Sequence, residues 1–533
     1  MVYRSNARAA FAPLTLMFLV SAISGCGSSS NSSDGVPTPP TTSTTASPTT
    51  PAPAPPSTAS TLVTASNSGD ACLPAAMPST TALFNAPKRV FAHYFNPDPV
   101  SIDDVASVDD YYNRNYLSIT GESSKWAAQG GFLRERPMGV PVSTSTNWRQ
   151  LNMEREVSAA IARGITGFTF DSMTATDATD SNSTLHLMLA AANAVDSRFK
   201  IVVMPDITAL GSDSDAVVEI IATAAASPAA YRLSDGRLVV TAFDASLNPP
   251  SWWQSVISRL TSEGINIAFV PTFLGWAASA DAFAPFSYGF GDWGTATVGS
   301  SSAQLGDPEI VHKTYGKIFM MPVDPQQYRP KDSVYWEAGN SGAFRDAWNS
   351  SIQGDADWIQ LVTWNDFTET SAISPITDAT LQTTIGTGFY NLTGYYATWF
   401  LNGQQPQITH DVLYYFYRRE ATTAASPAQT ERVSIVNGVA QNNIELLAFL
   451  TSPGVLTITI GGKTYTQNAA AGVVSFTVPS QAGTPLFTLS RSGADVFSFN
   501  GGVEIYGSAG LPSGIQDLTY WSGSASTAGV CTL

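Results

Sequence analysis

Short apolar runs alternate with amphipathic helical patterns through the middle of the chain. We identify eight such runs, which begin at Val90, Ile165, Lys200, Leu238, Ile267, Ser287, Lys317 and Trp358. Strands that alternate with helices at a spacing of roughly thirty residues build parallel sheets. Eight such units close into a barrel whose chemistry lies at the carboxyl ends of its strands. The pattern therefore predicts an α/β fold with a (β/α)8 TIM barrel.

Amphipathic helical patterns lie between several of these runs. Predicted helices cover residues 152–163, 184–195, 215–226, 252–263 and 390–401. Gly164 and Gly264 follow two of them, and glycine is a common helix terminator. After Arg419 the pattern changes to short strands separated by Gly and Asn turns, at residues 433–436, 445–450, 455–460, 473–478 and 486–489. This predicts a C-terminal β-sandwich, with the Gly- and Ser-rich segment from Asp495 packed on the sandwich or on the barrel.

The N-terminus has the composition of an export signal. Arg4 and Arg8 precede an apolar stretch at residues 11–20, which is too short to span a bilayer. The next segment, Ile23-Ser24-Gly25-Cys26, resembles the lipobox of bacterial lipoproteins. The resemblance implies a signal peptide at residues 1–25, lipidation of Cys26 and anchoring in the bacterial cell envelope, at the outer membrane or cell surface. An ordinary secretory signal with an incidental Cys is the alternative.

Four segments follow from these patterns. After the signal peptide, residues 26–70 are rich in Ser, Thr and Pro and almost uncharged, which predicts a flexible linker. We assign residues 71–410 to the barrel and 411–533 to the sandwich with its tail. Cys72 and Cys531 bracket this folded part, and exported proteins can keep disulfides. We predict a bridge between them, with two free thiols as the alternative.

Composition restricts the classes of partner. Charged residues make up 13% of the chain, below the roughly 25% that is usual for soluble domains. The net charge of −16 argues against nucleic acid or anionic lipid as a partner. The chain has four His, which leaves little material for a transition-metal site. Asp213 and Asp215 could suggest calcium, but they precede a helix and are better explained as a helix cap. We expect a monomer without a bound metal.

Acidic and aromatic residues end most of the apolar runs, and in a barrel these ends share one rim. Carboxylates and Asn accept hydrogen bonds from sugar hydroxyls, and indole rings stack on the C–H faces of sugars. Each Asp could instead be a helix cap or a turn residue. The substrate-binding candidates are His93, Tyr94, Asp206, Asp244, Trp276, Asp292, Trp293, Trp364 and Asn365, and Asp171 ends the second run.

The last run ends in the segment Trp364-Asn365-Asp366-Phe367-Thr368-Glu369. Glycoside hydrolysis needs one protonated carboxyl group and one ionised carboxylate. Burial and mutual repulsion would separate the two pKa values of Asp366 and Glu369. The spacing is compatible with close contact on a helical turn and with a wider separation on an open loop. A structural pair that caps the next helix is the alternative.

The motif Trp364-Asn365-Asp366-x-x-Glu369, followed by Pro375, resembles the signature of the glycoside hydrolase family 71 α-1,3-glucanases, or mutanases. Residues 90–95, 164–171 and 204–206 resemble the first three strands of that family. The resemblance covers about residues 88–401 and continues more weakly to residue 491. It implies a (β/α)8 barrel, no cofactor, and inverting cleavage of α-1,3-linked glucan.

Carried over by position, the resemblance makes Asp366 and Glu369 the catalytic carboxylates and Asp171 a required acid. We assign Glu369 as the general acid, because its longer side chain can reach the glycosidic oxygen, and Asp366 as the base that activates water. The chain departs from the fungal pattern next to this pair. Thr368 replaces a Gly, Thr370-Ser371 replaces Ser-His, and the region around Asp244 differs. These changes bear on the choice of substrate.

Three functions fit this sequence. The first is an α-1,3-glucanase that acts on an α-glucan polysaccharide or oligosaccharide. The second is a barrel hydrolase for another α-linked glycan, such as a mannan or a mixed α-glucan. The third is a surface-anchored glycan-binding lipoprotein with an inactive barrel. The presence of both Asp366 and Glu369 argues against the third, because binding alone does not require an acid and a base.

Overall fold

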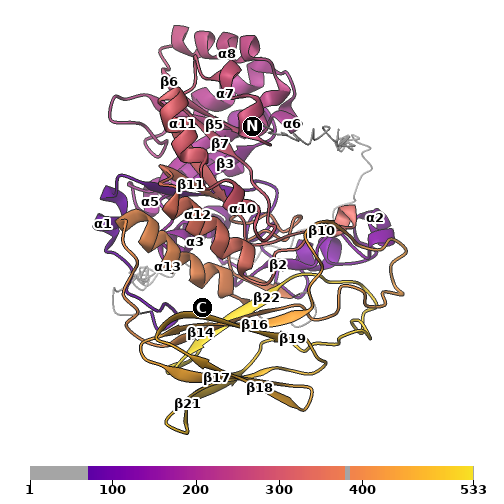
Figure 1. Cartoon of the computed structure of the whole chain (residues 1–533). Coiled ribbons are helices and arrows are strands. Elements are labelled where there is room, and N and C mark those ends of the chain that lie inside the picture. The colour runs from indigo at the N-terminus through magenta and orange to yellow at the C-terminus, as the bar shows by residue number, and fades with distance from the viewer. Residues whose placement is uncertain (1–69, 379–384, 532–533) are drawn as a thin grey trace, which may run out of the picture. The chain divides into compact units, whose positions relative to one another are not determined.

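A ring of parallel strands forms the centre of the computed structural model, which describes residues 70–378 and 385–531 (Figure 1). Within these residues, eight strands close into a barrel in the order β1-β11-β8-β7-β6-β5-β4-β3. They are β1 (Arg89–Tyr94), β3 (Gly167–Ser172), β4 (Lys200–Pro205), β5 (Leu238–Ala242), β6 (Ile267–Phe273), β7 (Gly289–Asp292), β8 (Ile318–Val323) and β11 (Trp358–Leu361). β1 pairs in parallel with both β3 and β11, which closes the ring. The predicted (β/α)8 barrel is confirmed.

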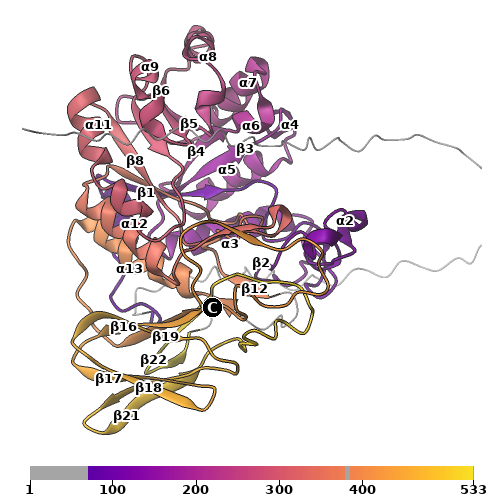
Figure 2. The same cartoon turned by 45° about the vertical axis from the view of Figure 1, so that its right-hand side comes forward.

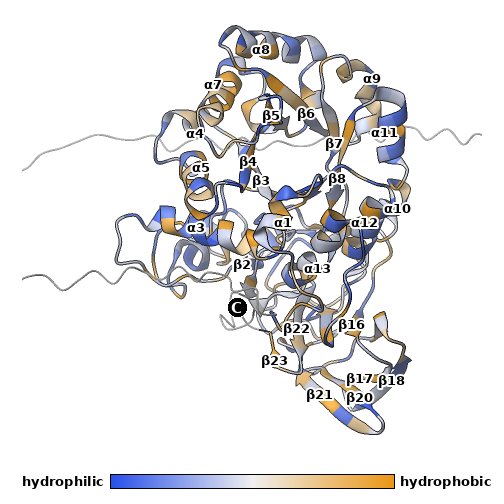
Figure 3. Cartoon of the chain, turned by 90° about the vertical axis from the view of Figure 1, so that its left-hand side faces the viewer, coloured by the Kyte–Doolittle hydropathy of each residue, from blue (hydrophilic) through white to orange (hydrophobic). Residues whose placement is uncertain are grey.

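Helices follow the barrel strands along the chain. The longer ones are α3 (Trp148–Ile161), α5 (Thr184–Val195), α7 (Ser214–Ala225), α8 (Pro250–Ser262), α11 (Asp307–Tyr315), α12 (Gly342–Gln353) and α13 (Gly388–Asn402). The shorter ones are α1 (Thr80–Asn85), α2 (Gly121–Ser124), α4 (Thr176–Thr179), α6 (Ile207–Leu210), α9 (Ala280–Phe283) and α10 (Ser300–Ala303). The predicted helix 184–195 is α5, and Asp213 caps α7 with its carboxylate. Figure 3 colours α7 as largely hydrophobic and α11 as largely hydrophilic, and the sequence analysis did not predict α11.

Side chains of the barrel strands separate into two groups, because successive residues of a strand face opposite sides. One group packs with the helices around the ring, and Phe168 and Phe170 of β3 belong to it. A second cluster is built almost wholly from strand residues, including Phe91 of β1 and Trp358 of β11. This second cluster fills the interior of the ring. The barrel is therefore a packed core, and its open chemistry has to lie at the strand ends.

The C-terminal strands form two antiparallel sheets, which lie one above the other in Figures 1 and 2. The first has the order β19-β16-β14-β22-β23, with β14 (Val412–Tyr417), β16 (Asn443–Leu450), β19 (Gly472–Pro479), β22 (Trp521–Ser526) and β23 (Gly529–Val530). The second has the order β18-β17-β20-β21, with β17 (Gly454–Ile460), β18 (Lys463–Ala469), β20 (Leu486–Arg491) and β21 (Ala494–Asn500). Apolar side chains of both sheets share one buried cluster. The predicted β-sandwich is present.

Two small sheets contain strands that are inserted between elements of the barrel. One joins β2 (Glu135–Pro137), β12 (Ile376–Asp378) and β13 (Ile385–Gly386). The other joins β9 (Gln327–Arg329), β10 (Val334–Trp336) and β15 (Ser434–Asn437). The strand predicted at 433–436 is present as β15. It belongs to this small sheet and not to the sandwich, so its predicted place in the sandwich is wrong. β15 pairs in parallel with β10, a partner about one hundred residues away that local sequence does not specify.

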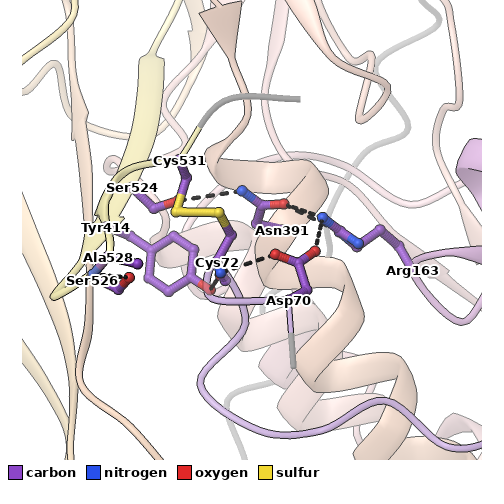
Figure 4. The surroundings of a disulfide bond; sticks show 9 residues. All are labelled: Asp70, Cys72, Arg163, Asn391, Tyr414, Ser524, Ser526, Ala528 and Cys531. Carbon is purple, nitrogen blue, oxygen red and sulfur yellow. Dashed lines mark hydrogen bonds and ion pairs between the residues drawn. A yellow bond between two sulfur atoms is a disulfide. The ribbon is translucent and has the colours of Figure 1, made fainter. Parts of the chain in front are cut away.

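A disulfide joins Cys72 to Cys531, with their Cα atoms 5.5 Å apart (Figure 4). The hydroxyl of Tyr414 donates to the carbonyl oxygen of Cys72 at 2.9 Å. Next to the bridge, Arg163 is 2.7 Å from Asp70 and also donates to Asn391 on α13. The predicted bridge therefore ties the start of the described chain to the last strands of the sandwich.

Several predictions concern residues outside the described part. These are the signal peptide 1–25, the lipidation of Cys26 and the linker up to residue 69. Within the described residues, the barrel helices end with α13 at Asn402 and the sandwich begins with β14 at Val412. No helix in this part of the chain combines the length and the apolar character needed to cross a membrane.

Candidate active site

The loop after β11 holds Asp366 through hydrogen bonds of its own backbone and side chain. The backbone N–H of Asp366 donates to the hydroxyl of Thr363 at 2.7 Å. Oδ1 of Asp366 accepts from the N–H of Thr368 at 2.8 Å, from its hydroxyl at 2.7 Å, and from the N–H of Glu369 at 3.1 Å. Thr368, where the sequence departs from the fungal pattern, thus supplies a hydroxyl that a Gly could not. These three bonds fix Oδ1 of the Asp366 carboxylate.

The environment of Asp366 makes protonation easier than in water. The side chain is buried, and burial is the main cause that raises its pKa to about 6. The negative charge of Glu369 is the second cause, and it is opposed by Lys331, Thr368 and Arg329. A carboxyl group with a pKa close to neutral can exchange a proton during a reaction at that pH.

Glu369 has a contrasting environment. Its Oε1 lies 2.7 Å from Nη2 of Arg329, and its Oε2 accepts from Nε2 of Gln327 at 2.9 Å. Its backbone carbonyl accepts from the N–H of Tyr328 at 2.8 Å. All three partners lie in β9. The two carboxylates of the motif therefore share one loop but are held by different elements.

Asp171 and His93 face each other at the ends of β3 and β1. Oδ2 of Asp171 is 3.8 Å from Nε2 of His93, and the His93 ring lies edge-on to Trp293 with 4.8 Å between ring centroids. Burial lowers the pKa of His93 to about 3, so this ring is neutral. Burial, followed by the charges of Asp206 and Asp366, raises the pKa of Asp171 well above its ordinary value. Oδ1 of Asp171 and Nδ1 of His93 are buried without a hydrogen-bond partner.

Three further acids predicted for this rim are at the strand ends; Asp206 and Asp244 are held by their own loops, and Asp292 is also held by the loop after β6. Asp206 caps α6 and accepts from Thr208, which fits the alternative of a helix cap. Asp244 accepts from the hydroxyl of Ser246. Oδ1 of Asp292 accepts from the N–H of Gly275 at 2.8 Å. Burial raises the pKa of all three carboxyl groups, that of Asp292 to about 6.

Two acids at this rim were missed by the sequence analysis. Asp98 follows β1, and burial and the charge of Asp366 raise its pKa well above the ordinary value. Asp324 follows β8, and burial and the charge of Glu369 raise its pKa in the same way. The run that forms β8 is followed by Pro322-Val323-Asp324, so the rule used for the other strand ends could have found Asp324. Asp98 lies further into a loop and has no such signal.

Four predicted substrate-binding residues do not line this rim. Tyr94 and Trp364 point to the outside of the ring, where both donate to the buried carboxyl group of Glu156 on α3. Tyr94 follows the inward-facing His93, and neighbouring residues of a strand face opposite sides. Trp276 packs on Phe319 and donates to Asp307, and its ring belongs to the core around the barrel. The side-chain amide of Asn365 is hydrogen-bonded to the backbone of the loop after β1.

The residues that do converge can perform acid and base chemistry on a polar substrate. Asp366, Glu369, Asp171 and His93 come from three barrel strand ends, and Trp293 adds an aromatic wall. The unpartnered atoms of Asp171 and His93 can bond to hydroxyl groups of a ligand, since buried polar groups normally have partners. Among the described residues, no group of three or more His, Cys, Asp or Glu side chains is arranged to hold a metal ion.

Comparison with known proteins agrees with this geometry. Residues 139–532 match the model of glycosyl hydrolase family 71. The glucan endo-1,3-alpha-glucosidase agn1 of Schizosaccharomyces pombe is 26% identical over 67% of this chain and 87% of its own length. A mutanase of Penicillium rubens is 25% identical over 61% of this chain and 76% of its own length. Among solved structures, a GH99 endo-alpha-mannosidase of Bacteroides thetaiotaomicron matches with a TM-score of 0.45, 17% identity, and coverage of 59% of this chain and 98% of that one. The chain belongs to glycosyl hydrolase family 71.

Proposed function

We propose that this protein is a glycoside hydrolase that cleaves α-1,3-glucosidic bonds in α-glucan. The observation that carries the proposal is the placement of Asp366 and Glu369 on one loop at the C-terminal rim of the barrel, with Asp171 and His93 beside them. The relatives named as a glucan endo-1,3-alpha-glucosidase and a mutanase support the choice of linkage.

Asp366 acts as the base in this reaction. Its pKa of about 6 leaves it ionised at neutral pH and able to take a proton from water. Glu369 protonates the glycosidic oxygen, and the configuration at the sugar carbon is inverted. Arg329 and Gln327 hold the Glu369 carboxylate in place beside Asp366.

The other rim residues bind the sugar. Asp171 and His93 offer unpartnered buried atoms to sugar hydroxyls, and Asp292 and Asp324 lie on the side of Glu369. Trp293 offers its ring to a C–H face of the sugar. We assign to Asp171 a required role next to the reacting carbon, because Asp366 is close enough to raise its pKa.

An incubation of purified residues 27–533 with a panel of α-glucans tests the activity. We expect release of reducing ends from α-1,3-glucan, and no release by the Asp366→Asn variant. If reducing ends are released only from an α-linked mannan or a mixed α-glucan, that glycan is the substrate instead of α-1,3-glucan. Binding of glycan without release by the unmodified protein would instead support a non-catalytic binding protein.

The place of the protein in the cell is a second proposal, which rests on the N-terminal sequence alone. We propose that Cys26 is lipidated and that the Ser/Thr/Pro-rich linker holds the enzyme at the bacterial cell envelope. Mass spectrometry of the N-terminal peptide from membranes tests this, with Cys26→Ser as the control. An unmodified Cys26 in a fully soluble product would contradict it.

A further inference from the structure

A hairpin between β8 and α12 grips the catalytic carboxylate Glu369. It consists of residues 326–337 and contains β9 and β10, and we refer to it as the 326–337 hairpin. Gln327 and Arg329 each bind one carboxylate oxygen of Glu369, and Tyr328 binds its backbone carbonyl. The guanidinium of Arg329 also lies 5.2 Å from the centre of the Trp336 ring, which belongs to the other strand of the same hairpin.

The 326–337 hairpin is in turn held by chain segments that come after the barrel. Its β10 pairs with β15, which lies beyond the first sandwich strand in the sequence. The hydroxyl of Tyr328 donates to the backbone carbonyl of Gln516 at 2.9 Å. Oε1 of Gln326 accepts from the backbone N–H of Tyr520 at 2.7 Å. Gln326 and Tyr328, which flank Gln327 in the sequence, are thus bound to the segment just before β22.

At its last residue, Glu337, the hairpin forms a buried ion pair with Arg418, which follows β14. Glu337 and Arg418 are 2.9 Å apart, and both side chains are almost fully buried. Glu337 also accepts from the hydroxyl of Tyr520 at 2.6 Å and from the backbone N–H of Gln441 at 3.0 Å. A buried pair with this many hydrogen bonds fixes one geometry, because each lost partner would leave an unpaired charge.

We propose that the C-terminal region sets the position of Glu369 through the 326–337 hairpin, so that Gln326, Tyr328 and Glu337 are positioning residues for the reaction. This inference rests on the proposed function. The bonds of the C-terminal region reach the backbone and side chains of the hairpin, and the hairpin in turn binds the Glu369 carboxylate. The sandwich is then part of the catalytic apparatus as well as a structural support.

If Glu369 is displaced, both the turnover number and the pH dependence of the reaction should change. Misplacing a reacting group by about 1 Å can cost up to a hundredfold in rate. The charge of Glu369 also raises the pKa of Asp366, so a Glu369 carboxylate that moves away lowers that pKa. A variant that loosens the hairpin should therefore change both the turnover number and the pH dependence, which a purely structural contact would not do.

The variant Tyr328→Phe tests the proposal, because it removes only the hydroxyl that binds Gln516. We expect kcat on α-1,3-glucan to fall about tenfold while KM stays near that of the unmodified enzyme. The acidic limb of the pH–rate profile should move to lower pH. If Tyr328→Phe is insoluble, Gln326→Met removes the bond to Tyr520 instead, and the same changes are expected.

Tyr417→Phe is the matched control. The hydroxyl of Tyr417 on β14 also donates to a backbone carbonyl, that of Val503 at 2.7 Å, and it is equally buried. Both variants lose the hydrogen bond that a buried tyrosine hydroxyl donates to a backbone carbonyl, and Tyr417→Phe also loses the bond from the Val503 N–H at 3.2 Å. The melting temperature of Tyr417→Phe should therefore fall at least as far as that of Tyr328→Phe. Only Tyr328→Phe should change kcat and the pH profile.

The results separate failure of this inference from failure of the proposed function. If the unmodified enzyme releases no sugar from any α-glucan, the proposed function fails. If it is active, and Tyr328→Phe or its substitute keeps kcat and the pH profile of the unmodified enzyme, the positioning role is overturned. The same conclusion follows if Tyr417→Phe changes both quantities to the same extent.

Discussion

At the scale of single residues, the site is defined by the environment of each carboxyl group. Asp366 is buried and its pKa is raised to about 6, while Glu369 is bound by Arg329 and Gln327. Asp171 and His93 are buried, and each has one polar atom without a hydrogen-bond partner. These differences in environment, more than the number of acids at the rim, are the basis on which we propose different roles for these groups.

The pH dependence follows from the pKa of Asp366. A base has to be ionised, so kcat/KM should fall about tenfold per unit as the pH drops below about 6. The fall should disappear from the residual activity of Asp366→Asn. A rate that falls instead as the pH rises through 6 would exchange the two roles, with Asp366 as the acid and Glu369 as the base.

Asp171→Asn tests the role of the acid at the end of β3. We expect kcat/KM on α-1,3-glucan to fall on the order of a hundredfold, because a group next to the reacting carbon loses its carboxylate. Asp213→Asn makes the same chemical change at the exposed cap of α7, where Asn is also a good cap. It should leave both activity and stability nearly unchanged. Equal activity of the two variants would remove Asp171 from the active site.

At the scale of elements, the direction in which a strand residue faces decides between core and site. Tyr94 and Trp364 pack against α3, whereas His93 and Trp293 meet at the rim. The loops after the strands then fix the rim residues by local bonds, as Asp206 does when it caps α6. An aromatic residue at a strand end can therefore stack on a sugar only when its side chain faces the rim and not the helices outside the ring.

Trp364 and Trp293 provide a matched comparison of these two positions. Trp364→Phe should lower the free energy of unfolding by about 1–3 kcal/mol, because it leaves space in the core and removes the bond to Glu156. The KM for glucan should not change. Trp293→Phe should raise KM several-fold. Thermal unfolding and initial rates measure the two quantities, and a raised KM in Trp364→Phe would contradict the placement.

At the scale of the whole molecule, the barrel and the C-terminal strands act together. The described residues, 70–378 and 385–531, belong to one compact unit. The disulfide joins the segment before the barrel to the end of the sandwich, and the 326–337 hairpin joins the sandwich side to Glu369. Removing the C-terminal region would therefore affect both stability and the catalytic geometry.

The disulfide should contribute to stability and not to catalysis. It closes a loop with a sequence separation of 459, and a crosslink of this kind typically stabilises by about 2–4 kcal/mol through the unfolded chain. The double variant Cys72→Ser and Cys531→Ser should melt at a lower temperature and keep its kcat at 25 °C. Loss of activity in the folded variant would indicate that the bridge also shapes the active site.

The sequence by itself determined the alternation of strands and helices, the sandwich and the acid pair, because each of these depends on neighbours within a few residues. The 184–195 helix and the strand-end acids Asp171 and Asp366 were recognisable for that reason. Tertiary structure decided which side chains face the rim, since His93 and Tyr94 differ only in the side of the sheet they occupy. It also decided that β15 pairs with β10 and that Arg329 holds Glu369, because these contacts join segments that no local pattern relates.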